Sequence, residues 1–396
     1  MSFLRAAHAA LVRQSGLCRI LAALGIVLVL AGLSVSCNSS GNVSRIAPNH
    51  NAYITLPANG SVALLHIDGP TGAITMGAQT PETFGTTPRG LALLPSRKFL
   101  YAVNSLDNSI SVFNVASDGT LGLASTTPVG GSSPDAAVID PSGKYLLVTN
   151  TLTNNISVFS IDAGSGALSL MGTPVYANTG PSEILITPSG RFVYVTNPGI
   201  GTVTEFSFSN GVLAQLPAPN SSVFSGLGAF GLAVDASERF LYVANPSASN
   251  PLVTTVGNVA GFNIDSGTGA LTAILGSPFF PSISNNSQGP SVITVDPNGR
   301  FVYAVSAGSS ASIWGFEITS SNGQLVTLTS SPFNLAAGDL FALIDPSGHY
   351  FYIGIGESTT SGIAGYTYDP STGTPTAITG SPFSTGTAPG KMVISE

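Results

Sequence analysis

Five charged residues lie just before short apolar runs, at equivalent or adjacent positions of a repeated segment: Arg89, Asp135, Glu183, Asp339 and Lys391. A guanidinium or ammonium group can hold an anion or a developing oxyanion, and a carboxylate can act as a general acid or base. If these residues meet in the fold, we predict a small polar ligand site in which Arg89 and Lys391 bind an anion and Glu183 or Asp135 transfers a proton. The competing interpretation is a solvated rim that holds no ligand. The sequence alone assigns no catalytic residue.

The elements that must position these residues come from a repeat whose clearest copy is Arg191–Asn197, with the sequence Arg-Phe-Val-Tyr-Val-Thr-Asn. Seven copies are anchored, at spacings of 46 to 61 residues, on Tyr53, Tyr101, Leu147, Tyr194, Tyr242, Tyr303 and Tyr352. A period of about 40 to 50 residues with four short strands is typical of a propeller blade. The sequence therefore predicts an all-β fold, a seven-bladed β-propeller with four antiparallel strands in each blade.

Each unit contains a short apolar run, such as Ala137–Ile139, followed by a turn such as Asp140-Pro141-Ser142-Gly143. Asp, Pro and Gly at these positions favour a type I turn, so we interpret the turn aspartates as structural. An unbroken apolar run indicates a strand that is buried on both faces. We expect it to be the innermost strand of the blade. Since the five charged residues precede such runs, they should ring one end of the central channel.

The two ends of the repeat region complement each other. The repeats start with a second strand near Tyr53, a third strand at Val62–Ile67 and a fourth at Ile74–Ala78, and they end with a lone innermost strand at Lys391–Ser395. We predict that these three N-terminal strands and one C-terminal strand complete a single blade. Such closure removes open sheet edges.

Residues 1–36 have the composition of an export signal. Three arginines precede or border an apolar run from Ile20 to Leu33, and Ser-Val-Ser leads to Cys37. Cys37 stands where lipoprotein signals place the cysteine that is acylated. Residues 37–50 would then form a polar tether, and residues 51–396 the propeller. We predict a lipid-anchored protein of the bacterial cell envelope, on the periplasmic face or the cell surface, with secretion as the alternative.

Charge and composition limit the partners. The leader holds 3 of the 12 basic residues and no acidic residue, so the mature chain keeps 9 basic against 19 acidic side chains. This excess of negative charge, without a basic cluster, excludes nucleic acid as an expected partner. The four histidines, His8, His50, His66 and His349, are scattered along the chain, and each hairpin has too few carboxylates for calcium. We expect no metal and no cofactor.

The stretch Phe192–Asn197 resembles the YVTN-type β-propeller repeat. The wider unit, from Gly180 to Phe206, is similar to the lactonase-type seven-bladed propellers, which include bacterial 6-phosphogluconolactonases and carboxymuconate-lactonizing enzymes. The resemblance covers about residues 50 to 396. It implies the propeller fold and a hydrolase that acts on a sugar lactone, although fold resemblance alone does not carry function.

At the positions where the lactonase-like enzymes carry His or Arg-His, this sequence has other residues. The segments before three innermost strands are Gly180-Pro181-Ser182-Glu183, Gly228-Ala229-Phe230-Gly231 and Gly289-Pro290-Ser291-Val292. The segment that would match their Asp-Leu-Gly-x-Asp pattern is Asn197-Pro198-Gly199-Ile200-Gly201. The missing imidazoles and aspartates argue against the family's chemistry, because lactone opening needs a base and an oxyanion partner.

The sequence therefore favours a non-catalytic binding or scaffold module at the envelope, whose partner is an envelope protein or a glycan. Longer loops at Pro246–Val256 and Pro278–Gly289 are expected on the face of the charged ring, where they would suit such contacts. One alternative is a lactone hydrolase whose site has been rebuilt around Arg89, Glu183 and Lys391. The other alternative is a structural surface protein that assembles with its own copies.

Overall fold

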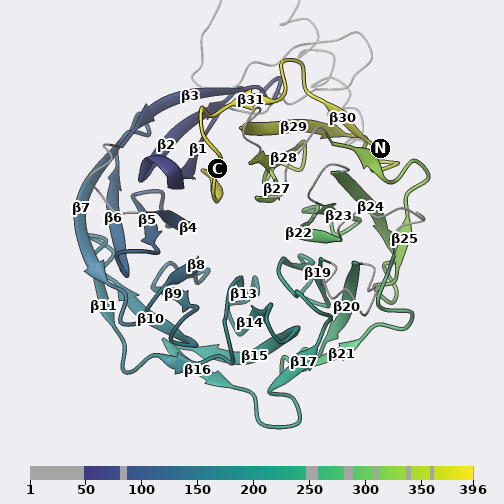
Figure 1. The fold of residues 1–396 in the computed structure, drawn as a ribbon, viewed down its shortest axis with the longest axis horizontal. Helices are drawn as coiled ribbons and strands as arrows, with labels where there is room; N and C mark the ends of the chain where they lie inside the picture. The colour runs from purple at the N-terminus through teal and green to yellow at the C-terminus, as the bar shows by residue number, and fades with distance from the viewer. Residues whose placement is uncertain are drawn as a thin grey trace, which may run out of the picture. The chain divides into compact units, whose positions relative to one another are not determined.

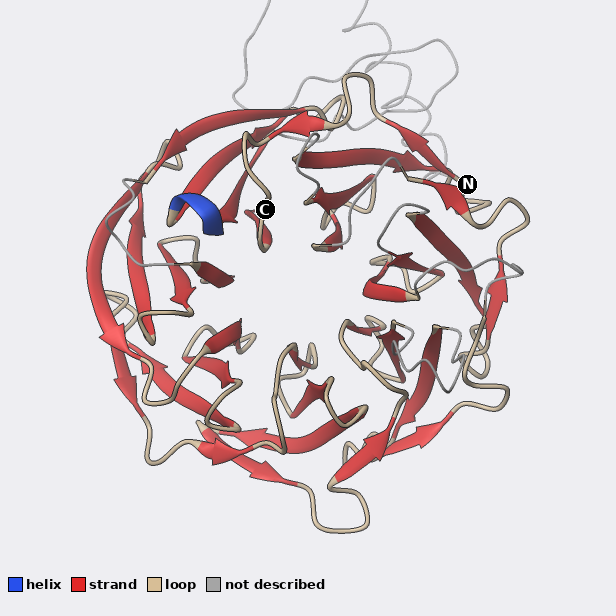
Figure 2. Cartoon of the chain, in the orientation of Figure 1, coloured by secondary structure: helices blue, strands red, loops and turns tan. Residues whose placement is uncertain are grey.

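The computed structural model describes residues 49–80, 87–246, 257–280, 289–306, 311–335, 340–356 and 361–395. These residues form seven sheets placed around a central axis, and one short 3-10 helix, η1 (Pro57–Asn59), is the helical element among them (Figures 1 and 2). Within each sheet the neighbouring strands run antiparallel. The predicted seven-bladed β-propeller is confirmed.

The strands occupy four positions in each blade, counted outward from the axis. The innermost strands are β32 (Met392–Ser395), β4 (Pro88–Leu93), β8 (Pro134–Ile139), β13 (Ile184–Ile186), β18 (Leu232–Val234), β22 (Pro290–Val295) and β27 (Ala342–Ile344). The second strands, which carry the repeat, are β1 (His50–Leu56), β5 (Phe99–Asn104), β9 (Tyr145–Asn150), β14 (Phe192–Asn197), β19 (Phe240–Asn245), β23 (Phe301–Ser306) and β28 (Tyr350–Ile355). We number the blades 1 to 7 in this order.

The third strands are β2 (Ser61–Ile67), β6 (Ser109–Val115), β10 (Asn155–Ile161), β15 (Thr202–Ser209), β20 (Asn258–Ile264), β24 (Ser312–Ile318) and β29 (Gly362–Tyr368). At the fourth position lie β3 (Ile74–Gln79), β7 (Leu121–Pro128) and β21 (Leu271–Ala273), and the other four blades have two short segments there. These segments are β11 (Leu168–Leu170) with β12 (Val175–Tyr176), β16 (Val212–Gln215) with β17 (Ser222–Phe224), β25 (Leu325–Thr327) with β26 (Phe333–Asn334), and β30 (Pro375–Ala377) with β31 (Phe383–Ser384).

Blade 1 closes the ring as predicted. Strand β32 pairs with β1 in a register that places Ser395 opposite Asn51 and Met392 opposite Ile54. Just before this ladder, the Thr55 N–H donates to the Lys391 carbonyl (3.0 Å), and the Lys391 N–H donates to Thr55 Oγ1 (2.9 Å). Figure 1 shows the purple and yellow ends of the described chain in one blade. Strand β1 begins at His50, the last residue that the sequence assigned to the tether.

The innermost strands are less buried than their apolar sequences suggested. In β13 only Ile184 is fully buried, and in β27 all three residues are half-buried. Both faces of β13 nevertheless pack against neighbouring blades, Ile184 and Ile186 against blade 3 and Leu185 against blade 5, so the expected burial on both faces is only partial. The remaining exposure arises at the inner edge of each strand, which faces the central axis and has no further strand paired to it. The second strands are the fully buried ones: every residue of β5, β14 and β19 is buried.

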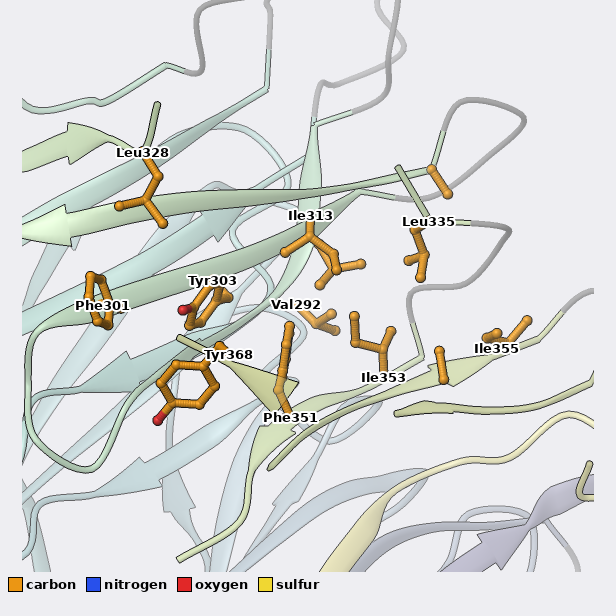
Figure 3. Close-up of a cluster of buried hydrophobic side chains, with 13 residues drawn as sticks. Val292, Phe301, Tyr303, Ile313, Leu328, Leu335, Phe351, Ile353, Ile355 and Tyr368 are labelled. Carbon is orange, nitrogen blue, oxygen red and sulfur yellow. The ribbon is translucent and has the colours of Figure 1, made fainter. Parts of the chain in front are cut away.

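Packing between neighbouring blades forms the core. Between blades 6 and 7 the Tyr303 ring stacks on Phe351 with ring centroids 5.1 Å apart, and Ile313, Ile353 and Tyr368 pack around them (Figure 3). The Tyr303 hydroxyl also donates to the Gly373 carbonyl of blade 7 (2.7 Å). Such aromatic contacts add to the free energy gained from the buried apolar area.

The same hydrogen bond from a second-strand tyrosine to the next blade recurs around the ring. The six tyrosines at the anchor position of the second strands each donate to a hairpin glycine of the next blade, at 2.7 to 3.0 Å: Tyr53 to Gly119, Tyr101 to Gly166, Tyr194 to Gly269, Tyr242 to Gly323, Tyr303 to Gly373 and Tyr352 to Gly72. Burial raises the pKa of Tyr53 to about 12, so its hydroxyl stays protonated and able to donate. Blade 3 has Leu147 at this position. There Tyr145 packs edge-on against Phe208 of blade 4, with centroids 5.6 Å apart.

The turn aspartates are structural, as the sequence indicated. Asp140 is buried, and its Oδ1 accepts the N–H groups of Lys144 (2.8 Å) and Tyr145 (2.7 Å). Asp296 and Asp345 make the equivalent bonds in blades 6 and 7. Each carboxylate therefore satisfies backbone donors where the innermost strand turns into the second strand.

Candidate functional site

Four of the five charged residues lie at one end of the central axis, which we call the mouth. Arg89 belongs to β4 and Asp135 to β8, whereas Glu183 and Lys391 directly precede β13 and β32. The innermost strands all begin at this end, so side chains from blades 1 to 4 come together there. The fifth residue, Asp339, lies outside the described residues, as do Cys37 with its leader and most of the two longer loops.

An ion pair spans the mouth. Lys391 Nζ lies 2.5 Å from Glu183 Oε2, and the two side chains come from blades 1 and 4, which face each other across the axis (Figure 1). The Lys391 side chain is 32% exposed and the Glu183 side chain 23%. The pair is therefore only partly screened by water, and a charge-assisted bond there is stronger than one on an open surface.

A second pair lies beside the first. Arg89 Nη1 is 3.2 Å from Asp135 Oδ1, and the Ser182 hydroxyl donates to Asp135 Oδ2 (2.6 Å). These contacts connect blades 2, 3 and 4. The Arg89 side chain is 58% exposed, so the attraction to Asp135 is weakened by solvent, and the guanidinium can turn toward a ligand.

Ser182 was not among the residues that the sequence singled out. It orients Asp135 from the neighbouring blade, and its own backbone is fixed because its N–H donates to the Thr196 carbonyl (2.9 Å). Its position next to Glu183 was a usable signal, since residues at corresponding places in a propeller face the same mouth. The sequence did not show which blade's carboxylate it would contact.

A cavity of about 210 Å³ lies among the charged side chains and the innermost strands. Its walls are mainly apolar or glycyl, with Leu91, Ile293, Phe341 and Met392 among the lining residues, whereas Glu183 and Lys391 supply charge. Gly90 is part of the wall, and a Cβ there would come within 2.9 Å of the Asp135 carbonyl. The close approach of blades 2 and 3 thus depends on this glycine. The cavity has room for a small molecule at the mouth.

The arrangement combines a carboxylate with two cations. Glu183 can accept a proton from water, and the Lys391 ammonium can stabilise negative charge on a nearby oxygen. Arg89, at the rim, can bind an anionic substituent. The sequence predicted the participants, and the structure adds the pairing: Glu183 with Lys391, and Asp135 with Arg89 and Ser182.

Another carboxyl with an altered pKa lies away from the mouth. Glu205, in β15 of blade 4, is 1% exposed, and its Oε2 accepts the N–H of Leu271 in blade 5 (2.9 Å). Burial raises its pKa to about 7, although the bond from Leu271 acts in the opposite direction. Since it lies in a third strand and ties two blades together, we assign it a structural role.

The described histidines lie away from the mouth. His66 in β2 contacts Asn51 Oδ1 through Nδ1 (2.9 Å), and His349 Nδ1 lies 2.9 Å from the Ser347 hydroxyl in a turn at the opposite end of the axis. Within the described ranges, no three His, Cys, Asp or Glu side chains gather as a metal site would need. The same ranges contain no helix long and apolar enough to cross a membrane.

Comparisons with known proteins agree with this architecture. Among the solved structures, a candidate 6-phosphogluconolactonase from Bacteroides fragilis superposes with a TM-score of 0.72 at 19% identity, covering 91% of this chain and 100% of its own. The periplasmic gluconolactonase PpgL from Pseudomonas aeruginosa superposes with a TM-score of 0.71 at 16% identity, covering 88% and 99% of the two chains. At this level of identity the likeness shows the fold alone.

A search of curated proteins finds no match. By contrast, the sequence model of the family described as "Lactonase, 7-bladed beta-propeller" matches residues 45–180 and 183–388. These two stretches span most of the chain and include every strand except β32. Together with the ring of seven sheets, they show that the chain belongs to the lactonase family of seven-bladed β-propellers.

Proposed function

We propose that the mouth binds a small sugar-type lactone and that Glu183 and Lys391 hydrolyse it. The observation that carries the proposal is the Glu183–Lys391 pair, because it sets a carboxylate base beside a cation over a cavity of small-molecule size. The sequence argued against hydrolysis because no base was positioned near an oxyanion partner. That argument is weaker once Lys391 stands 2.5 Å from Glu183.

In the proposed reaction, Glu183 takes a proton from a water molecule as its oxygen attacks the lactone carbonyl carbon. The carbonyl oxygen gains negative charge, which Lys391 stabilises. When the tetrahedral intermediate collapses, the ring C–O bond breaks and the protonated Glu183 returns its proton to the leaving alkoxide. Lactone and water are the only reactants, and the product is an open-chain hydroxy acid. The step therefore needs no further reactant.

Arg89 would set the substrate class. Its guanidinium lies at the exposed rim, and planar bidentate contacts favour phosphate or carboxylate groups. A lactone bearing an anionic group should therefore be preferred to a neutral one. Asp135 and Ser182 would hold Arg89 in place without touching the reacting atoms.

Hydrolysis of glucono-lactone and 6-phosphogluconolactone by the purified propeller tests the proposal. We expect turnover above the spontaneous rate, with Glu183→Gln lowering kcat/KM by about a hundredfold, because general base catalysis is typically worth that much or more. Arg89→Ala should raise KM for the phosphorylated lactone and leave the neutral lactone nearly unaffected. Glu317→Gln, on an exposed third-strand position, is the matched control.

Hydrolysis should be followed by acid release at fixed pH, with circular dichroism to confirm that each variant is folded. A protein that hydrolyses neither lactone, or a Glu183→Gln variant as active as the wild type, would refute the hydrolase. Lys391→Met, compared with Lys144→Met in a turn at the other end of the axis, separates loss of the oxyanion partner from loss of a surface charge.

A second candidate is a binding module anchored at the cell envelope, which the sequence favoured. The two carboxylates at the mouth, Asp135 and Glu183, each have a cationic partner. Such paired charges also suit a binding site that catalyses no reaction. In addition, Phe224, Leu227 and Phe230 are 64%, 40% and 37% exposed on the return into blade 5, at the mouth face. Exposed apolar groups of this kind suit contact with a protein or glycan of the envelope. Ligand binding without lactone hydrolysis would favour this binding module. If its partner is another copy of the chain, the module is a self-assembling surface protein.

The proposed anchor is tested at Cys37. The mature protein should fractionate with membranes and carry acyl chains at Cys37 in an intact-mass measurement. Cys37→Ala should release the protein or leave its leader attached. Cys18→Ala, which changes the other cysteine of the chain, should behave as the wild type. A mature chain cut elsewhere and free of acyl mass would contradict the anchor.

A further inference from the structure

A second and larger cleft, of about 860 Å³, lies between blades 1 and 2. Its lining includes His50, where β1 begins, and Ser395, where β32 ends. The mouth, in contrast, lies where the innermost strands begin. The cleft is therefore at the opposite end of the axis, and the site proposed above does not include it.

The cleft follows from one departure in the repeat. Two positions before the anchor residue, the other blades have an aromatic side chain, namely Phe99, Tyr145, Phe192, Phe240, Phe301 and Tyr350. All six rings lie against the hairpin glycine of the next blade, so closely that a Cβ on that glycine would overlap them: Gly166, Gly211, Gly269, Gly323, Gly373 and Gly72. In blade 1 the residue is Asn51, which faces Gly119. An amide side chain is smaller than a ring, so it leaves space where the other blades are filled.

The space is lined by nitrogen-bearing side chains from three places in the chain. Arg97 and Lys98 come from the turn before β5, His50 begins β1, and His66 lies in β2. Across the described residues, Arg97, Lys98 and the His50 ring have neither an ion pair nor a side-chain hydrogen bond. By comparison, Arg191, Arg239 and Arg300, which align with Lys98, donate to hairpin carbonyls of the next blade.

Arg97 stands at an unfavourable backbone position. Its φ is +59°, in the left-handed region, where blades 3, 4, 6 and 7 have Gly143, Gly190, Gly299 and Gly348. Glu238 takes this place in blade 5 and contacts Ser189 of blade 4 with its carboxylate. A long side chain is thus tolerated at this turn where it reaches toward the preceding blade. For Arg97, that direction leads to the cleft with blade 1.

Two carboxylates belong to hairpins that border the cleft, Asp68 in its lining and Asp118 between the lining residues Ser117 and Gly119, and each is held by its own hairpin. Asp68 Oδ1 accepts the Thr71 N–H (2.9 Å) and hydroxyl (2.6 Å). Asp118 Oδ1 accepts the Thr120 N–H (3.0 Å) and hydroxyl (2.7 Å). They offset part of the positive field without occupying the donors of Arg97 and Lys98. Recognition in the cleft must therefore depend on short hydrogen bonds rather than on long-range attraction.

We propose that this cleft binds a small ligand carrying an oxyanion, either a phosphate ester or a carboxylate. Arg97 and Lys98 would hold the anionic oxygens, because a guanidinium matches two such oxygens at once and an ammonium adds a third donor. His50, His66 and Asn51 would meet hydroxyl groups on the rest of the ligand. A volume of about 860 Å³ admits a ligand the size of a sugar phosphate and its water.

Calorimetric titration tests the proposal with glucose 6-phosphate and glucuronate as probes, inorganic phosphate as the minimal anion and glucose as the neutral control. We expect the two anionic sugars to bind and glucose not to bind. Arg97→Gly should weaken binding about tenfold, the usual effect of losing one charge-assisted contact, and yet raise the melting temperature, because glycine suits the turn. Asn51→Phe should fill the cleft and remove binding altogether.

Lys98→Met and Lys144→Met form the matched pair, since both lysines directly precede a second strand and only Lys98 lines the cleft. Binding to vesicles of phosphatidylglycerol is compared with binding to vesicles of phosphatidylcholine. If the phosphatidylglycerol vesicles alone bind, and Arg97→Gly weakens that binding, the oxyanion belongs to a lipid headgroup. The proposal is overturned if no probe binds, or if Arg97→Gly and Asn51→Phe bind as the wild type does. Arg89→Ala removes the anion-binding group of the mouth without touching the cleft, so binding that persists in this variant belongs to the cleft, whatever the outcome for the hydrolase.

Discussion

Removal of the last eight residues, 389–396, is expected to unfold the propeller or make it aggregate. The deletion removes β32, whose Met392 is buried and whose backbone pairs with β1 from Asn51 to Ile54. Burial of an apolar side chain contributes about 1.5 to 3 kcal/mol, so the strand and the β1 residues that it covers contribute about 5 kcal/mol or more. This is comparable with the whole stability of a typical domain, and β1 would be left as an open edge.

Thermal unfolding and size-exclusion chromatography measure this effect. A rearranged chain supplies the control: residues 389–396 placed before Asn49 through a short glycine-rich linker should recover the melting temperature, because Ser395 already pairs with Asn51 and the two strands can form a hairpin. Closure by β32 would be contradicted by a truncated protein that stays monomeric and melts with the wild type. A rearranged chain that fails to recover would show that pairing of residues 389–396 with β1 is not sufficient for stability.

Stability should fall as the pH rises from about 4.5 to about 7, and Glu205 should cause most of that fall. Its pKa of about 7 in the folded protein exceeds the ordinary value of 4.5. Below pH 4.5 both folded and unfolded states hold the proton. Between the two pKa values only the folded state holds it, so the free energy of unfolding decreases with rising pH. A difference of this size corresponds to roughly 3 kcal/mol.

Urea unfolding at pH 4.5, 6 and 7.5 tests this slope. Glu205→Gln keeps an oxygen that can accept the Leu271 N–H, so the variant should fold and lose most of the pH dependence. Glu317→Gln should retain it. The hairpin aspartates do not contribute to the change in stability between pH 4.5 and 7. Hydrogen bonds in their own turns hold the pKa values of Asp118, Asp162 and Asp265 below the ordinary value of 3.8. A slope that Glu205→Gln leaves unchanged would assign the effect to other groups.

The fold could be predicted from the sequence because each blade repeats the same local sequence pattern. The anchor residue, the Asp-Pro-Ser-Gly turn and the apolar run recur in register, so the number of blades and the closing strand follow from counting. The burial of the innermost strands was misjudged for a geometric reason. A run such as Ile184–Ile186 packs both faces against neighbouring blades, and only the closed ring shows that its unpaired inner edge is left open toward the axis.

The candidate site was predictable only in part. Equivalent positions in successive blades had to reach one mouth, which identified Arg89, Asp135, Glu183 and Lys391. Their pairing could not be read from the repeat, because Lys391 bonds across the axis to blade 4 and not to a neighbouring blade. Glu205 was missed altogether, although a signal existed: it stands where the aligned blades carry Val112, Val158 or Gly261.

The closing strand also governs when the protein can fold. The bond between the Lys391 N–H and Thr55 joins residues that are 336 apart in sequence, so the first blade stays one strand short until nearly the whole chain is available. Contacts so distant in sequence slow the final folding step. During synthesis, blades 2 to 7 can assemble in order while β1 waits for β32. The ring therefore stays open until synthesis is nearly complete, and the edge of β1 is exposed for all of that time.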